Sequence, residues 1–133
     1  MSHSLVSNRL LLASLVLIGA SLISRANGDD APKYAADIQP LFKKNCYSCH
    51  GSEKTESGLR LDRKADALAG GDSGKVIVPG DAAASTLIKL VSGKDPDRIM
   101  PPNGEKLTTK QIDALKKWID DGADWPVEDA PSS

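Results

Sequence analysis

The chain has 133 residues, with 17 basic and 18 acidic side chains and a formal net charge of −1. This length predicts one domain rather than two. The balanced charge offers no basic surface of the kind that nucleic acids require, so we expect no nucleic-acid partner.

The N-terminal segment 1–28 has the three-part layout of a secretory signal peptide. A polar start with Arg9 precedes the apolar run LLLASLVLIGASLI (10–23), and Ala26 and Gly28 are the small residues at the cleavage site. The apolar run is shorter than the ~20 residues that span a bilayer. We expect cleavage after Gly28, export to the periplasm or another extracytoplasmic space, and no stable membrane insertion afterwards. An uncleaved membrane anchor is the alternative.

Cleavage would remove two of the 17 basic side chains and none of the 18 acidic ones, which leaves a net charge of −3. The mature chain would contain one Phe, two Tyr and two Trp. This is a small aromatic supply for the core of a domain of this size. A buried porphyrin would add apolar bulk, although small aliphatic side chains could also suffice.

The first predicted element is a helix from about Asp37 to Asn45 that leads directly into Cys46. Asp37 is the expected N-cap, and Pro40 falls in the first turn, where a missing amide hydrogen is tolerated. The apolar positions at helical spacing are Tyr34, Ile38, Leu41 and Phe42.

The segment 51–81 is rich in Gly, Ser, Asp and Lys, which predicts mostly loop. Within it, residues 59–61 and 76–78 are candidates for very short strands. Residues 62–68 are a candidate for one or two helical turns.

Two further helices are predicted in the C-terminal half. The first is short, is capped by Asp81 or Ser85, and ends before Gly93. The second has the clearest signals, because Thr108 and Gln111 form a capping box at its start. Its apolar stripe consists of Ile112, Leu115, Trp118 and Ile119.

The run Cys46-Tyr47-Ser48-Cys49-His50 combines two thiols with an imidazole. Thiols at this spacing can bond to the two vinyl groups of a haem, and the histidine that follows can bind its iron. A disulfide and half a zinc site are the alternatives, but zinc would require ligands that the mature chain lacks, because His50 is its only histidine. We therefore expect one haem c, covalently bound through Cys46 and Cys49, with His50 as an iron ligand.

Met100 is the candidate for the sixth iron ligand. It is the only methionine outside the predicted signal, and Pro101 and Pro102 stiffen the loop behind it by fixing φ. A thioether is a soft ligand that raises the reduction potential of a haem. A core-filling role for Met100, ligation by Lys106, and an open or water-bound iron are the alternatives.

Three other side chains have possible roles beside a haem. Trp118 is assigned to the core, although it could also pack on the haem edge. Arg98 or Trp125 could donate a hydrogen bond to a haem propionate, and the sequence does not choose between them.

Most of the predicted mature chain resembles the planctomycete-type cytochrome c domain, a branch of the small His/Met cytochromes c. The matching stretches are IQPLFKKNCYSCHG (38–51), SGLRLDRKADALAGGDSGKVIVPGDAAASTLIKLV (57–91), RIMPPNGEKLT (98–108) and IDALKKWIDDGADWP (112–126). The resemblance implies an all-α, cytochrome c-like fold with three to four helices around one covalently attached haem. It also implies first and last helices that cross beside the haem. The residues themselves predict long loops and at most two very short strands.

The resemblance further implies Cys46 and Cys49 as thioether positions, His50 as the proximal ligand and Met100 as the distal ligand. In related cytochromes a proline carbonyl often orients the proximal imidazole. Pro79 is the candidate for that role here, although the loop between His50 and Pro79 is longer than in those cytochromes.

The expected organisation is a signal peptide (1–28), a monohaem cytochrome c domain (29–126) and a flexible C-terminal tail (127–133). The expected function is that of an exported one-electron carrier without enzymatic activity, which exchanges electrons with redox protein partners. The alternatives are a haem-based sensor or peroxidase-like module with a labile sixth ligand, and a structural module with an oxidised cysteine pair.

Overall fold

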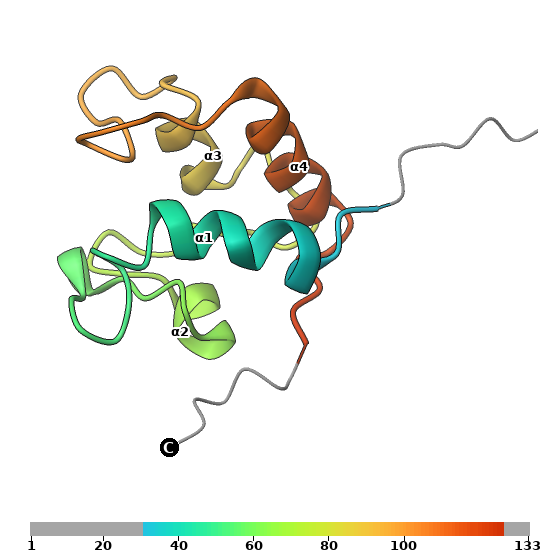
Figure 1. Ribbon diagram of the computed structural model, residues 1–133, viewed down its shortest axis with the longest axis horizontal. Helices are drawn as coiled ribbons and strands as arrows, with labels where there is room; N and C mark the ends of the chain where they lie inside the picture. The colour runs from blue at the N-terminus through green and yellow to red at the C-terminus, as the bar shows by residue number, and fades with distance from the viewer. Residues whose placement is uncertain (1–30, 127–133) are drawn as a thin grey trace, which may run out of the picture.

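Helical segments joined by long loops make up the part of the chain that the computed structural model describes, residues 31–126 (Figure 1). The expected signal peptide and C-terminal tail lie outside these residues. In chain order the segments are a π-helical turn (Tyr34–Ile38), α1 (Gln39–Asn45), a 3₁₀ turn (Glu56–Gly58), α2 (Lys64–Ala69), α3 (Thr86–Val91) and α4 (Thr109–Asp120). The all-α prediction is confirmed, and none of these helices is long and apolar enough to cross a membrane.

No β-strand forms within residues 31–126, so the strands considered at 59–61 and 76–78 are absent. Backbone pairing in this part of the chain is limited to two isolated bridges. Both candidate segments instead run as loops that bury apolar side chains: Leu61 in the first, and Val76 and Ile77 in the second. Their apolar pattern therefore reflects contact with the core rather than strand pairing.

The first helical stretch begins three residues earlier than predicted, at Tyr34, as a π-helical turn. Asp37 is not the N-cap; its carboxylate accepts a hydrogen bond from the Lys33 N–H at 2.8 Å. The wide turn has a local cause in Pro40, which lacks an amide hydrogen and whose ring would clash with the Ala36 carbonyl in a continuous α-helix. The extra turn gives the stretch enough length to reach α4.

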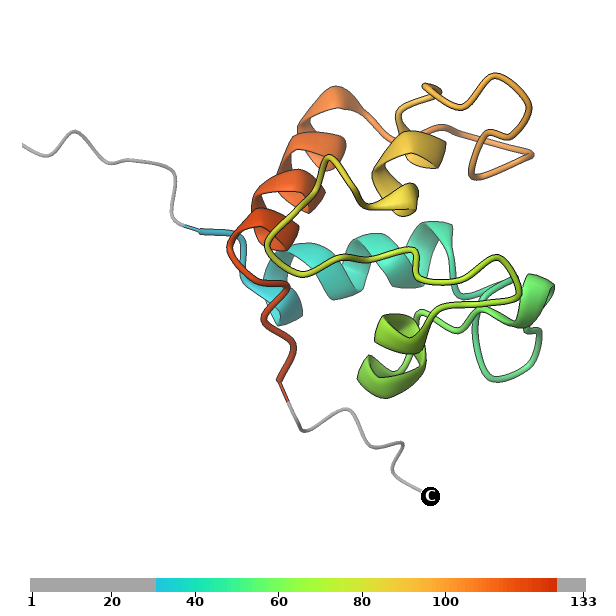
Figure 2. The same ribbon diagram turned by 180° about the vertical axis from the view of Figure 1, so that it is seen from behind.

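The first and last helices cross (Figures 1 and 2). An aromatic cluster packs between them. This aromatic cluster consists of Tyr34, Phe42, Trp118 and Trp125, all at most 3% exposed. Tyr34 stacks on Trp125 at a centroid distance of 4.3 Å, and Phe42 meets Trp118 edge-on at 6.0 Å. The Trp118 Nε1–H donates to the Asp124 carbonyl at 2.9 Å, so the assignment of Trp118 to the core is confirmed.

The capping box at the start of α4 is confirmed. The Gln111 N–H donates to the Thr108 hydroxyl oxygen at 3.2 Å, and the Thr108 N–H donates to the Gln111 side-chain oxygen at 2.8 Å. Two of the otherwise unpaired donors of the first turn are therefore satisfied. The predicted apolar stripe faces the core: Leu115, Trp118 and Ile119 are buried and Ile112 is half-buried.

The loop before α3 is fastened by Ser85, which is fully buried. Its hydroxyl donates to the Asp81 carbonyl at 2.8 Å and accepts from the Val78 N–H at 2.9 Å. Ser85 therefore stands at the N-cap position of α3, but its side chain closes the preceding turn instead of capping the helix. The same loop is attached to the end of α4, since the Gly80 N–H donates to the Ile119 carbonyl at 2.7 Å.

We expect Thr108→Ala to lower the free energy of unfolding by about 1 kcal/mol, because it removes one half of the capping box. Chemical denaturation followed by circular dichroism measures this. Thr109→Ala, one position later, is the control and should have a smaller effect. Equal stability of wild type and Thr108→Ala would show that the box contributes nothing.

Candidate haem site

A cavity of about 510 Å³ lies beside the C-terminal end of α1, between α3 and the loops at residues 50–61 and 98–105. Its volume is within the range of ~300–1,000 Å³ found for ligand and cofactor sites. The apolar part of its wall consists of Leu59, Leu61, Val76, Leu87, Leu90 and Val91. Cys46, Cys49, His50 and Met100 all line this one cavity.

The cysteine motif forms a tight turn immediately after α1. The Cys46 N–H donates to the Phe42 carbonyl at 2.8 Å, and the His50 N–H donates to the Cys46 carbonyl at 2.8 Å. Both thiols are unpaired. Burial, with a smaller contribution from the neighbouring Cys49, raises the pKa of the Cys46 thiol to about 12.

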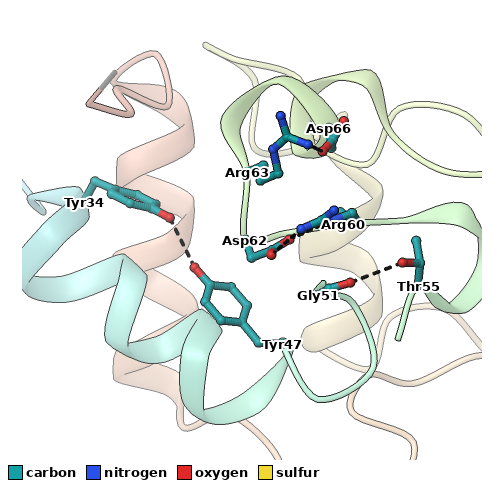
Figure 3. A network of polar contacts seen from close by, with 8 residues as sticks. All are labelled: Tyr34, Tyr47, Gly51, Thr55, Arg60, Asp62, Arg63 and Asp66. Atoms are coloured by element: carbon teal, nitrogen blue, oxygen red, sulfur yellow. Dashed lines mark hydrogen bonds and ion pairs between the residues drawn. The ribbon is translucent and has the colours of Figure 1, made fainter. Parts of the chain in front are cut away.

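Two neighbours fix the path of this turn. The Tyr47 hydroxyl lies 3.4 Å from the Tyr34 hydroxyl, which links the motif to the start of the first helix (Figure 3). Gly51 is buried, and a Cβ at this position would lie only 2.5 Å from the Tyr47 carbonyl oxygen. Only glycine therefore permits the chain to turn so closely past the motif.

His50 is held by the segment 59–61 through both its side chain and its backbone. Its Nδ1 lies 3.3 Å from the Leu59 carbonyl oxygen, and its own carbonyl accepts the Leu61 N–H at 2.8 Å. Because a carbonyl only accepts, Nδ1 carries the hydrogen, and the lone pair of Nε2 is left available for a metal. Leu59, and not the candidate Pro79, supplies the carbonyl that orients this imidazole.

The segment 59–61 is in turn clamped by an ion pair. The guanidinium of Arg60 donates to both carboxylate oxygens of Asp62, at 2.9 and 2.7 Å (Figure 3). The two side chains are 25% and 18% exposed, and the hydrogen bond from Arg60 is the main cause that lowers the pKa of Asp62. A bidentate pair on either side of Leu61 restricts the backbone that positions His50.

Met100 comes from the loop that follows α3. Its N–H donates to the Leu90 carbonyl at 3.2 Å, and its half-buried side chain packs against the hydrophobic core. Lys106, the competing donor, does not line the cavity; its ammonium group donates to the Pro101 carbonyl. Met100 therefore lines the cavity, whereas Lys106 is bonded to the backbone of its own loop.

Of the two candidates for a propionate partner, only Arg98 lines the cavity. Its guanidinium lies 3.2 Å from the Asp95 carboxylate. Trp125 belongs to the aromatic cluster, and its buried Nε1–H has no hydrogen-bond partner. Arg98 and Lys44 are therefore the cations that line the cavity and could meet an acidic group there.

The residues of the cavity fit a covalently bound haem. Two unpaired thiols lie on one turn, beside an imidazole whose Nε2 is available, and aliphatic side chains provide an apolar wall. Among the described residues, no group of three or more His, Cys, Asp or Glu could hold a metal ion. The zinc alternative for the cysteine pair therefore lacks its remaining ligands.

Sequence reasoning missed the support around His50. Leu59 acts through a backbone carbonyl, which no side-chain pattern reveals. Arg60 and Asp62 did carry a signal, because opposite charges two positions apart flank an apolar residue. That pattern can also belong to a solvated loop, so only the fold gives it a meaning.

We expect Asp62→Asn to lower the free energy of unfolding by about 1 kcal/mol at pH 7. Since Arg60 lowers the pKa of Asp62 in the folded protein, this contribution is present above the unfolded-state pKa of about 3.9. It is lost as the pH falls through the lower folded-state value. Denaturation of wild type and variant at pH 7 and in acid should show a difference that shrinks in acid.

The control for this measurement is Asp66→Asn, which weakens the more exposed Arg63–Asp66 pair, 3.4 Å apart (Figure 3). Its effect should be smaller. A difference for Asp62→Asn that is the same at both pH values would contradict the role of the carboxylate charge.

Comparison with known proteins identifies one family. Residues 46–104 match the family model described as Planctomycete cytochrome C. No match was found among the curated proteins or the solved structures. The matched range contains Cys46, Cys49, His50 and Met100, and the cytochrome c family implies a covalently bound haem and electron transfer. The family match over residues 46–104 supports a planctomycete-type cytochrome c domain in this chain, and the helical fold is compatible with it.

Proposed function

We propose that the protein is an exported carrier of single electrons, with one haem c bonded to Cys46 and Cys49 and its iron held between His50 and Met100. The observation that carries this proposal is that His50 and Met100, 50 residues apart in sequence, line the same cavity. They come from two loops that are each fastened separately to the rest of the fold. Export is proposed from the signal-like segment 1–28.

When bound, a haem of this kind supplies an iron that alternates between the ferrous and ferric states. The Nδ1–H···O=C bond from His50 to Leu59 fixes the orientation of the ring and the nitrogen that it offers. The thioether of Met100, a soft ligand, favours the ferrous state and raises the reduction potential. The aliphatic wall excludes water, which disfavours the more highly charged state.

An electron carrier, rather than an enzyme, is the function that two protein ligands support. If His50 and Met100 both held the iron of a bound haem, no coordination position would remain for a substrate. The apolar cavity wall also offers no second histidine as a distal acid or base. The partners would be other redox proteins, which exchange electrons across a contact surface without entering the cavity.

Met100→Ala should abolish the sulfur-to-iron charge-transfer band in the visible spectrum of the ferric protein. The reduction potential should fall by on the order of 0.1 V, a fraction of the ~0.8 V range that axial ligands cover. Carbon monoxide should then bind rapidly to the reduced variant, because the sixth position is open.

The matched control is Ile99→Ala, at the preceding position of the same loop, where the side chain is 45% exposed. It should leave the band in place. A band that persists unchanged in Met100→Ala would exclude Met100 as the ligand. Rapid carbon monoxide binding by the wild type would favour the sensor or peroxidase-like alternative.

Covalent attachment has a test of its own. Protein made in a host competent for c-type cytochrome maturation should retain the mass of one haem after denaturation. The double variant Cys46→Ala, Cys49→Ala should lose it, whereas the exposed control Ser52→Ala should keep it. Wild-type protein with an unmodified mass and a Cys46–Cys49 disulfide would instead identify a structural module.

A further inference from the structure

The loop that carries Met100 leaves α3 and returns to it at neighbouring positions. At its start the Lys94 N–H donates to the Lys89 carbonyl at 3.0 Å, and at its end the Met100 N–H donates to the Leu90 carbonyl at 3.2 Å. The two accepting carbonyls belong to consecutive residues of α3. Met100 therefore reaches the cavity only while the five residues between, 95–99, stay folded back on themselves.

The side chain of Asp95 holds the segment 95–99 in its folded-back conformation. Its Oδ1 accepts the backbone N–H groups of Asp97 and Arg98, each at 3.0 Å, and its Oδ2 accepts from the Arg98 guanidinium at 3.2 Å. Pro96 has no N–H and a fixed φ, so the turn is built on the next two amides. The Asp95 carboxylate thus connects the first residue of this segment to Arg98, two positions before Met100.

The two hydrogen bonds from the backbone amides of Asp97 and Arg98 to Asp95 stabilise this turn more than the ion pair does. The Asp95 side chain is only 19% exposed, whereas that of Arg98 is 54% exposed, so the ion pair itself is largely screened by water. The same bonds lower the pKa of Asp95, with the amide of Asp97 as the largest cause. Hydrogen bonds from amides to a charged carboxylate are stronger than those to neutral acceptors.

We propose that Asp95 is the positioning residue that holds the thioether of Met100 at the haem iron; this rests on the ligation by Met100 proposed above. Asp95 does not line the cavity. It acts through the loop: without its carboxylate, residues 95–99 gain conformational freedom, and Met100 spends a larger fraction of time away from the iron. Open sites of this kind are accessible to external ligands.

The test compares three variants of the full haem-loaded chain. Asp95→Ala removes all three hydrogen bonds, and Asp95→Asn keeps an acceptor oxygen for the two amides. Asp97→Asn is the matched control, because it makes the same charge change on an exposed side chain in the same loop. The readouts are the sulfur-to-iron charge-transfer band, the reduction potential, the rate of carbon monoxide binding and the melting temperature.

Asp95→Ala should weaken the charge-transfer band, lower the reduction potential and accelerate carbon monoxide binding by roughly tenfold, since the two backbone amides and the Arg98 guanidinium lose the carboxylate that accepts their hydrogen bonds. Asp95→Asn should lie between Asp95→Ala and wild type, and Asp97→Asn should match wild type. A change in melting temperature alone, with band, potential and binding rate unchanged, would overturn the proposal. So would equal effects of Asp95→Ala and Asp97→Asn.

The two proposals fail differently. If Met100→Ala keeps the charge-transfer band, the ligation by Met100 is wrong. If Met100→Ala loses the band but Asp95→Ala behaves as wild type, only the role of Asp95 is wrong. If Asp95→Ala fails to fold, the comparison of Asp95→Asn with Asp97→Asn decides. Identical rates of carbon monoxide binding for these two variants would refute the role of Asp95.

Discussion

The candidate site depends first on how His50 is held. The tight turn after α1 brings two thiols and an imidazole to one cavity, but a turn alone does not fix the direction of a ring. The Leu59 carbonyl does so by accepting the Nδ1–H, and the Leu61 N–H holds the carbonyl of the same histidine. The Arg60–Asp62 pair then restricts this segment, so that a loop without strand pairing supports the imidazole of His50.

The loop that carries Met100 is also held by backbone hydrogen bonds. Met100 also comes from a loop, and that loop is fastened at both ends to consecutive carbonyls of α3 and closed inside by Asp95. Long loops can hold two candidate ligands because each is tied to a helix through the backbone. The aromatic cluster packs where the first helical stretch crosses α4, and the turn with His50 follows directly from that stretch. The Met100 loop is attached to α3, which in turn contacts α4.

Side-chain patterns predicted most of this fold, and backbone contacts account for what they missed. The capping box and apolar stripe of α4 could be predicted because they follow fixed spacings, and the cysteine motif because its chemistry requires consecutive residues. The early start of the first helix could not be predicted, since it reflects a wide turn that relieves the clash of Pro40. Neither Leu59 nor Asp95 could be found in this way, because each acts on its neighbours through groups that only the folded chain brings together. The apolar alternation at Leu61 suggested a strand, although the segment buries that side chain without a pairing partner.

X-ray absorption at the iron of the purified haem-loaded protein tests the central proposal most directly, because it reports the atoms bound to the metal. A centre held between His50 and Met100 should show a sulfur neighbour in addition to the nitrogens of the porphyrin and the imidazole. Met100→Leu, which keeps the size of the side chain, should lose the sulfur signal. A wild-type spectrum with only nitrogen and oxygen neighbours would contradict the account.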